Sequence, residues 1–433
     1  MTFPSPQHEN TTHQDSEQSA LNVLHYGACV IALLGFYGPL RMAGIVDEEG
    51  VLERYLTMGF YLVIFLITTY TVIHNWPNAK KVIRQNRWFF IFLGYAVLSA
   101  LWSTMINVSI NRAVQLCCIT CVAIAITLVY KDGDLCRLLR VSTAIIMAYV
   151  ILYSVSDPVD SGLADLQNRF WGPFEIPNGV GQVCAVAVCV WFPVLFFRRS
   201  YGQFVVALGV IASSVVAVIY ADSITSMAMI LFVAGAGIVS RWTVPISPES
   251  RSLMKIGGFG LTVLCCVLVF TYGDQIVDFI VSRTFDSLGR TSDFTGRLPF
   301  WTLLVSNLVS NNRLLFGYGV GGFWNKDSGP AYDLLYGGWT PNQAHNGFLD
   351  LLMHGGIVGL LLFLPYLVSS VKDARKFFRY GGVERETLFN IIIALTILNF
   401  TESHFARMIS YLWILFLVTS FYIRDRLSKL GAI

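Results

Sequence analysis

The sequence predicts an all-helical integral membrane protein with about twelve transmembrane helices. Of its 433 residues, 55% are hydrophobic and only 13% are charged, and the mean hydropathy is +0.60. Soluble domains carry about a quarter charged residues. The apolar residues also occur in runs close to the ~20 residues that a helix needs to cross a bilayer. This composition makes the lipid bilayer a partner and excludes soluble enzymes and nucleic-acid-binding proteins.

The chain begins with a polar segment, residues 1–20, that contains no Lys or Arg. A signal peptide has a basic n-region followed directly by an apolar stretch. The segment lacks both features, and its composition is typical of disorder. We therefore expect residues 1–20 to form a disordered tail in the cytoplasm.

Twelve stretches with few or no charges follow this tail, and each predicts one span. Nine of them form a block over residues 21–273, and three form a block over residues 347–423. A second cytoplasmic tail, residues 424–433, follows the last span. The twelve stretches are 21–40, 55–79, 88–111, 113–130, 141–156, 176–197, 200–221, 223–240, 256–273, 351–371, 388–401 and 408–423.

The distribution of basic residues predicts the orientation of these spans. With the amino terminus in the cytoplasm, 20 of the 30 Lys and Arg residues fall in cytoplasmic loops and 10 fall outside. This bias agrees with the positive-inside rule and places both termini in the cytoplasm. Nine of the ten external residues are Arg, whose planar fork binds phosphate or carboxylate through two parallel hydrogen bonds. The outer face therefore suits an anion, although arginines there can also reach lipid headgroups or pair with carboxylates.

Residues 274–346 form one long external segment between the ninth and tenth spans. Loops of this length usually have a function. Within the segment, residues 298–312 place apolar side chains at helical spacing, and Pro299 is acceptable in the first turn of a helix. We expect an amphipathic helix that lies at the membrane surface. This long segment, together with the lack of an internal repeat, disfavours a common secondary transporter.

The nine cysteines indicate neither a disulfide framework nor a metal site. All but Cys136 fall within or beside apolar runs, where a thiol behaves as a small buried hydrophobe. Cys117, Cys118 and Cys121 share one predicted helix, but no second Cys or His cluster completes the four ligands of a zinc site. We expect no metal and no cofactor.

Three external segments contain residues suited to chemistry. The first is residues 168–179, before the sixth span, where residues 177–179 predict a turn and a helix start. A turn that enters a membrane needs such residues for structural reasons alone. Arg169 beside Trp171 is not required by turn geometry, which makes Arg169 a candidate anion ligand.

The second segment, residues 290–297, leads into the predicted surface helix. Arg290 and Arg297 flank several hydroxyl groups here. A helix amino terminus adds unpaired N–H donors and a partial positive charge, so the segment predicts a phosphate cradle. The alternative is a solvated polar turn.

The third segment, residues 317–324, is rich in glycine and aromatic residues and includes Tyr318 and Trp324. Its glycines match the pattern GxGxxG, but no parallel-strand unit surrounds them, which disfavours a dinucleotide site. The glycines instead predict a tight loop with close approach between backbones.

His345 precedes the tenth span and is the strongest candidate for a catalytic residue. The amino terminus of a helix disfavours an imidazolium, and a neutral imidazole can accept a proton. A purely structural histidine is the alternative reading.

Two further groups of polar residues lie close to the predicted membrane boundary. Asp350 follows Asn346 by four residues and therefore shares a helical face with it. Glu402, His404 and Arg407 cluster near the outer ends of the last two spans. They either pair with each other or line the same cavity.

Taken in order, these segments resemble the bacterial O-antigen ligase and polysaccharide polymerase family, most closely its exopolysaccharide-polymerase branch. The resemblance covers roughly residues 90–410, and five ordered matches are more specific than any single one. The matching elements are Gly-Pro-Phe at 172–174 with Pro-Asn at 177–178, Ser-Ile-Thr-Ser at 223–226, Leu-Gly-Arg at 288–290 with Thr-Gly-Arg at 295–297, Leu-Phe-Gly-Tyr-Gly at 315–319 with Phe-Trp at 323–324, and His-Asn-Gly-Phe-Leu-Asp at 345–350.

The resemblance implies a metal-independent, inverting glycosyltransferase of the C type. It would work at the periplasmic face of the bacterial inner membrane on glycans linked to undecaprenyl pyrophosphate. The resemblance gives His345 the role of base for the acceptor hydroxyl. Arg169 and Arg297, and more weakly Arg290, would bind the pyrophosphate, with Asn346 as a further substrate ligand. Guanidinium groups fixed in a partly dry site can stabilise the charge of a leaving diphosphate. The supporting residues are Asn178, Tyr318, Trp324, Asp350 and Glu402.

The leading hypothesis is the polymerisation of lipid-linked repeat units into exopolysaccharide. An O-antigen ligase, which transfers glycan to lipid A core or another acceptor, uses the same chemistry, so the acceptor decides between the two. A polysaccharide or small-molecule transporter is the less favoured alternative. Candidate further partners are a chain-length regulator and polysaccharide export proteins.

Overall fold

The computed structural model describes residues 51–130, 133–156, 170, 172–174, 177–197, 200–243, 293–324, 329–332, 334, 342–407 and 410–431. Within these ranges every regular element is a helix, as the sequence predicts. The helices are α3 (Val51–His74), α4 (Trp76–Gln85), α5 (Arg87–Leu98), η1 (Ser99–Trp102), α6 (Ile106–Val129), α7 (Asp134–Ser156), η2 (Gly172–Phe174), α8 (Pro177–Phe196), α9 (Tyr201–Tyr220), α10 (Ile224–Thr243), α12 (Asp293–Ser310), α13 (Gly347–Phe378), α14 (Val383–Leu398) and α15 (Tyr411–Lys429).

Five of the described helices are long and apolar enough to cross a membrane. They are α6, α7, most of α8, α9 and α13. This finding agrees with an integral membrane protein, while the count of twelve spans stays a prediction. The predicted spans at 21–40 and 256–273 lie outside the described residues.

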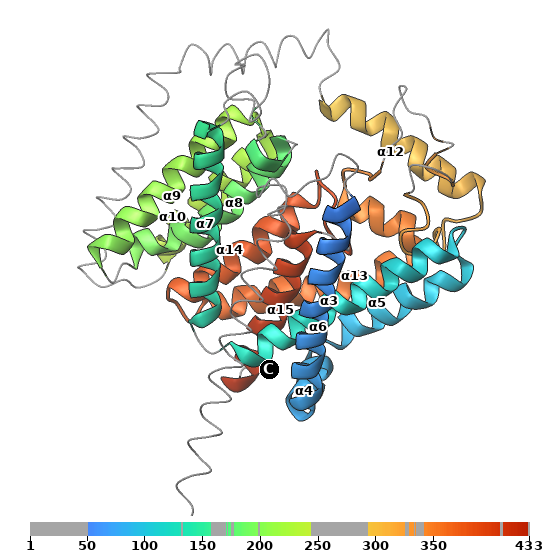
Figure 1. Cartoon of the computed structure of the whole chain (residues 1–433), viewed down its shortest axis with the longest axis horizontal. Coiled ribbons are helices and arrows are strands. Elements are labelled where there is room, and N and C mark those ends of the chain that lie inside the picture. Colours follow the sequence, from blue (N-terminus) through green and yellow to red (C-terminus); the bar gives the residue numbers. More distant parts are fainter. Residues whose placement is uncertain are drawn as a thin grey trace, which may run out of the picture.

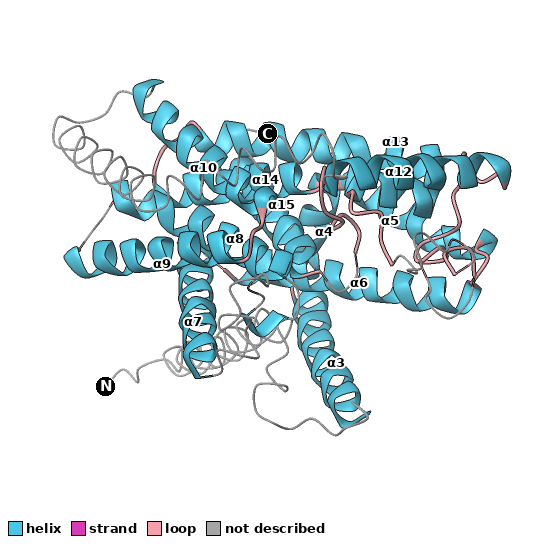
Figure 2. Cartoon of the chain, turned by 90° about the horizontal axis from the view of Figure 1, so that it is seen from above, coloured by secondary structure: helices cyan, strands magenta, loops and turns pink. Residues whose placement is uncertain are grey.

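The helices form three neighbouring groups (Figure 1). α8 packs against α7, α9, α10 and α14, and α13 packs against α5, α14 and α15. α14 and α15 therefore lie between the group of α7–α10 and the group of α5, α6 and α13. Figure 2 shows α9 and α10 at one end of the molecule and α12 with α5 at the other.

A buried polar network fixes the carboxyl-terminal end of α15. Arg424 is only 4% exposed, and its Nη2 lies 2.6 Å from Asp373 Oδ2 in α13. Its Nη1 donates to Asn86 Oδ1 at 3.0 Å, which ties in the start of α5. Residues 424–429, which the sequence predicts as part of a tail, belong to α15. Loss of either partner of this buried ion pair would leave an uncompensated charge, so the pair holds the end of α15 against α13.

One predicted span, residues 88–111, is interrupted in the structure. α5 ends at Leu98, so it is only roughly 18 Å long at 1.5 Å per residue, and α6 begins at Ile106. Ser103 between them is extended, and its Oγ accepts the Met105 amide at 3.1 Å. Serine favours helix ends over helix interiors because its hydroxyl competes for the backbone. The absence of charged residues from the range 88–111 predicts a continuous span and does not reveal this break.

α12 lies where the sequence predicts a surface helix over residues 298–312. It begins five residues earlier than expected, so Arg297 lies within the helix and Pro299 lies beyond its first turn. Its buried residues Phe300, Leu304 and Leu308 recur every four positions. They pack on the glycine-rich loop that follows.

α13 contains a break at Gly356, which has a φ of +63° and a ψ of −164°. The loop after α12 supplies backbone hydrogen bonds across this break. Tyr318 N donates to Met353 O at 2.9 Å, and Ile357 N donates to Leu314 O at 2.9 Å. Groups freed by a broken helix must find such partners where water is excluded.

The same contact confirms the prediction that these glycines permit close approach between backbones. We expect Gly317→Ala to destabilise the protein by about 1–3 kcal/mol, because Gly317 has a φ of +65° and an added Cβ would lie 2.6 Å from the carbonyl carbon of His354. Thermal unfolding of the purified protein in detergent checks this. Gly209→Ala in α9 is the control, since a Cβ there meets nothing within 4 Å. Equal melting temperatures for the two variants would contradict the proposed packing.

Candidate active site

The start of α13 holds His345 in a defined position. His345 adopts a left-handed conformation, with a φ of +50°, and the helix begins two residues later. Asn346 caps the helix, because its Oδ1 accepts the amides of Phe348 and Leu349 at 3.0 and 3.1 Å. The cap leaves the His345 side chain outside the helix, where it is 27% exposed. The predicted position of His345 at a helix amino terminus is confirmed.

Gly347 brings this helix start against the connection between α14 and α15. Its amide donates to Asn399 O at 2.8 Å and to Glu402 O at 3.1 Å. Asn399 Oδ1 in turn accepts the amides of His404 and Phe405 at 3.0 and 2.8 Å, which fixes the turn that carries Glu402. The three consecutive residues at 345–347 therefore have three separate tasks. The histidine faces the site, the asparagine caps the helix, and the glycine permits close contact.

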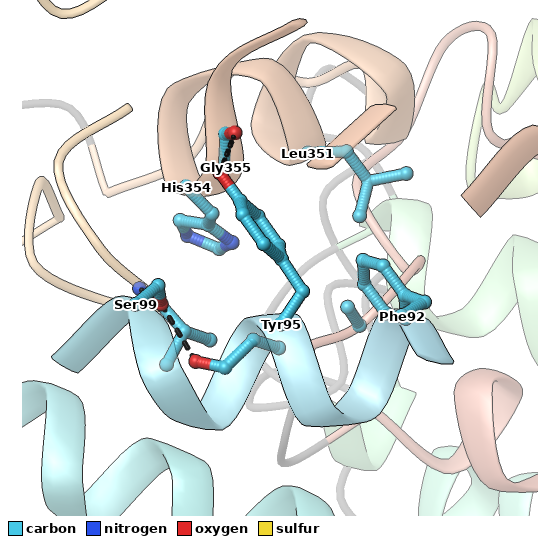
Figure 3. A pocket seen from close by; sticks show the side chains of 9 residues that line it. Phe92, Tyr95, Ser99, Leu351, His354 and Gly355 are labelled. Carbon is cyan, nitrogen blue, oxygen red and sulfur yellow. Dashed lines mark hydrogen bonds between the residues drawn. The ribbon is translucent and has the colours of Figure 1, made fainter. Parts of the chain in front are cut away.

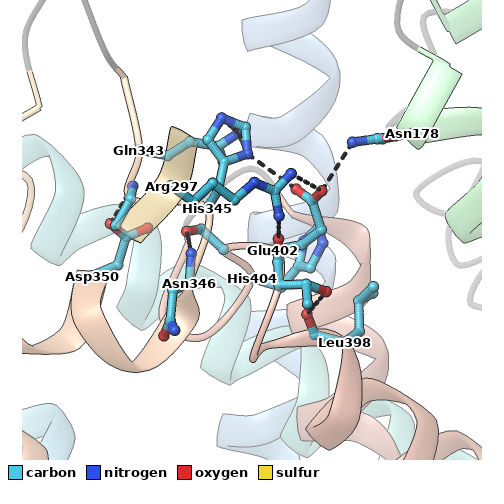
Figure 4. Close-up of polar contacts among 12 residues, drawn as sticks. Asn178, Arg297, Gln343, His345, Asn346, Asp350, Leu398, Glu402 and His404 are labelled. Atoms are coloured by element: carbon cyan, nitrogen blue, oxygen red, sulfur yellow. Dashed lines mark hydrogen bonds and ion pairs between the residues drawn. The ribbon is translucent and has the colours of Figure 1, made fainter. Parts of the chain in front are cut away.

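Glu402 is the point where four separate segments meet (Figure 4). Its Oε2 lies 3.4 Å from His345 Nδ1. Its Oε1 accepts a hydrogen bond from Asn178 Nδ2 at 2.9 Å and lies 3.6 Å from Arg297 Nη2. Arg297 Nη1 also donates to Thr401 O at 2.6 Å. α8, α12, the segment before α13 and the segment after α14 each contribute one side chain.

The charge state of Glu402 follows from these partners. Burial raises the pKa of this carboxyl, but the hydrogen bond to His345 and the electrostatic interactions with His345 and Arg297 outweigh burial. The pKa of Glu402 is therefore below its usual value, and the side chain is ionised at neutral pH. An ionised carboxylate beside Nδ1 orients the imidazole and stabilises it when it carries a proton.

Within the described residues, no side-chain hydrogen bond joins the predicted cluster of Glu402, His404 and Arg407, although the backbone amide of Arg407 donates to His404 O at 3.1 Å. Glu402 contacts His345 and Arg297, while His404 Nδ1 lies 2.9 Å from Ser410 Oγ. Burial lowers the pKa of His404 to about 3, which keeps it neutral. Arg407 donates to the side chain of Gln343, whose Nε2 lies 3.3 Å from His345 Nδ1. Gln343 is a neighbour of His345 that no sequence pattern indicated.

In the described part of the chain, three of the predicted supporting residues, Asp350, Tyr318 and Trp324, form no hydrogen bond or ring contact with His345 or Glu402. Asp350 is buried and accepts the Ala344 amide at 2.9 Å, so it holds the backbone before His345 rather than the imidazole. Tyr318 donates to Asn307 Oδ1 at 2.5 Å, and Trp324 stacks edge-on against Phe323. Both aromatic residues belong to the hydrophobic cluster under α12. Arg169 and Arg290 lie outside the described residues.

A small cavity lies at the break in α13 (Figure 3). Tyr95, Ser99 and His354 line it, with Val320 and Ala406 from two other segments. Tyr95 Oη donates to Gly355 O at 2.6 Å. Both ring nitrogens of His354 are buried without a hydrogen-bond partner among the described residues.

Two comparisons with known proteins bear on this arrangement. Residues 210–364 match the family described as O-Antigen ligase. The chain is also 24% identical over 324 residues to the exopolysaccharide production protein ExoQ of Rhizobium meliloti (strain 1021), and the aligned region covers 72% of this chain and 69% of that protein. The predicted resemblance to the O-antigen ligase family is confirmed.

The part that matches the O-antigen ligase family does not contain the whole site. It runs from α9 into α13 and includes Arg297, the glycine-rich loop and His345. Asn178 precedes it and Glu402 follows it. Asn178 and Glu402, which contribute to the site around His345, therefore come from outside the part of the chain that matches the family.

Proposed function

We propose that this protein polymerises undecaprenyl-pyrophosphate-linked oligosaccharide repeat units into exopolysaccharide at the periplasmic face of the bacterial inner membrane. The observation that carries the proposal is the contact between His345 and the ionised Glu402, next to Arg297. In a metal-independent glycosyl transfer, an imidazole oriented by a carboxylate can accept a proton, and a guanidinium can stabilise the charge of a leaving pyrophosphate. The match to the O-antigen ligase family and the similarity to an exopolysaccharide production protein support the substrate class.

The proposed reaction is a single displacement. His345 Nδ1 faces Glu402, so Nε2 is the atom assigned to remove the proton from the acceptor hydroxyl. The hydroxyl oxygen then forms a bond to the anomeric carbon of the donor, and the bond from that carbon to the pyrophosphate oxygen breaks. The electron pair of the broken bond leaves with the pyrophosphate, and the configuration at the anomeric carbon inverts.

Arg297 is assigned to the pyrophosphate. Its side chain is 22% exposed, and Glu402 and Thr401 hold its guanidinium in place. A positioned cation stabilises the negative charge that builds up on the leaving group without reorganising during the reaction. Arg169 and Arg290 are further candidates for this role, and Asn346 is a candidate substrate ligand in addition to its cap. A chain-length regulator and export proteins are candidate partners.

The proposal is tested with purified full-length protein in liposomes that contain an undecaprenyl-pyrophosphate-linked repeat unit, without added metal. We expect a ladder of products that differ by one repeat unit. A second candidate function, ligation of finished glycan to another acceptor, is favoured by the description of the matching family. Products that form only when lipid A core is supplied would select the ligase, and no joined glycan under either condition would contradict both proposals.

A further inference from the structure

Arg407 is linked to His345 through the side chain of Gln343. Arg407 follows Glu402 in the connection between α14 and α15, and it donates to Gln343 Oε1 and, at 3.4 Å, to Ser403 O. The amide nitrogen of Gln343 lies 3.3 Å from His345 Nδ1. One glutamine therefore separates Arg407 from the proposed base.

Arg112 brings a further positive charge to the same region. It lies near the start of α6, and its side chain packs so closely on Gly321 that a Cβ there would lie 2.5 Å from Arg112 Cγ. Val320 and Ala406, which precede Gly321 and Arg407 in the sequence, line the same small cavity, so the segments that carry Gly321 and Arg407 lie next to each other. Arg112 accordingly lies within electrostatic reach of Arg407.

These two arginines lack the neutralisation that Arg297 has. In the part of the chain that the structure describes, no ion pair joins Arg112 or Arg407 to a carboxylate, and Arg112 hydrogen-bonds only to Gln115 Oε1, at 3.1 Å. Asp350 is within electrostatic reach of Arg407, but its Oδ1 accepts the Ala344 amide instead. Arg297, in contrast, lies 3.6 Å from Glu402.

Both guanidiniums are half-buried, so they have lost part of their hydration. Like charges in such a place repel each other, and burial without a counter-charge is unfavourable. An anion that bridges the two relieves both effects. The planar fork of arginine matches phosphate oxygens through paired hydrogen bonds, which a point charge cannot do.

We propose that Arg112 and Arg407 form a second cationic site that binds a phosphate group of the lipid-linked glycan. The identity of this ligand rests on the proposed function, because in a polymerase both the donor and the acceptor carry a lipid-linked pyrophosphate. The donor pyrophosphate and the acceptor pyrophosphate offer the same chemistry to this site. Two assays separate the existence of the site from the source of the phosphate.

The first assay measures the binding of inorganic pyrophosphate to purified full-length protein by the shift in melting temperature. We expect at least tenfold weaker binding for Arg112→Gln and for Arg407→Gln, and a smaller loss for Arg112→Lys. Arg379→Gln, which changes an exposed arginine at the other end of α13, is the matched control. If Arg112→Gln does not fold, Arg112→Lys and Arg407→Gln decide. Affinities within twofold of wild type in every folded variant would overturn the site.

The second assay follows transfer from a labelled lipid-linked donor to soluble repeat units with or without a terminal phosphate. A rise of tenfold or more in the donor KM of Arg112→Gln assigns the site to the donor. A similar rise that is confined to the phosphorylated acceptor assigns it to the acceptor, and unchanged KM values for both would overturn the proposal. A wild-type protein that binds pyrophosphate through Arg112 but joins no glycan would reject the proposed function and retain the site.

Discussion

Replacing His345 with alanine is expected to stop glycan joining while leaving pyrophosphate binding nearly unchanged. A positioned base contributes about 10²- to 10⁴-fold to rate, and the variant loses the atom assigned to receive the proton. The imidazole contacts the side chains of Glu402 and Gln343, whereas the cap of α13 depends on Asn346. The helix start should therefore survive the change. Product ladders and pyrophosphate affinity, measured on the same preparation, check both halves of this expectation.

A second histidine supplies the control for this experiment. His74 is exposed at the end of α3 and stacks on Tyr70, far along the chain from the site. His74→Ala should keep the wild-type rate. A rate for His345→Ala above a tenth of wild type would rule out the base assignment, and a parallel loss of pyrophosphate affinity would make His345 a binding residue instead.

The local parts of the site could be predicted from the sequence. A histidine, an asparagine cap and a glycine at 345–347 follow rules that act over one helical turn, so the sequence places His345 at a helix start. The glycines of the loop that contains Gly317 likewise predict close approach between backbones, because glycine has no Cβ, and the structure adds that Gly317 has a positive φ. In each case the determining contacts lie within a few residues or follow from the backbone requirements of a single residue type.

The partners of Glu402 could not be predicted in the same way. Asn178 and Glu402 are 224 residues apart, and Arg297 and Thr401 are 104 residues apart. The sequence left two options for Glu402, pairing with its neighbours or lining a cavity with them. In the structure, α8 and α12 pack near the start of α13, and Glu402 pairs with His345 and Arg297 instead of with its neighbours in sequence. No local sequence pattern predicts this packing.

Hydropathy also conceals interruptions in helices. The sequence predicts one continuous span for each of the ranges 88–111 and 351–371, because neither range contains Asp, Glu, Lys or Arg. The structure ends α5 at Leu98 and breaks α13 at Gly356, and loop backbone satisfies the groups exposed at the second break. Apolar composition predicts that a segment is buried in lipid or protein, but it does not predict that the segment is continuous.

Glu402→Gln is expected to lower kcat by about 10²- to 10⁴-fold while changing the KM for donor far less. Glutamine keeps the size of the side chain and an oxygen for Asn178, but it removes the charge that orients His345 and stabilises its protonated form. Glu402 acts through His345, so it is a positioning residue in the proposed reaction. A loss that appears in KM alone would instead assign Glu402 to substrate binding through Arg297.

The dependence of the melting temperature of Glu402→Gln on pH is an independent test of the charge on Glu402. Because the pKa of Glu402 is lower in the folded protein than the ~4.3 of a free glutamate, ionisation stabilises the fold above that value. This stabilisation disappears as the pH falls through the lowered pKa. Wild type should therefore lose melting temperature more steeply than Glu402→Gln when the pH falls from 6 toward 3. Glu384→Gln, in the first turn of α14, should follow the wild-type curve. If the curve of Glu402→Gln ran parallel to that of wild type, Glu402 would not carry the charge that the site assigns to it.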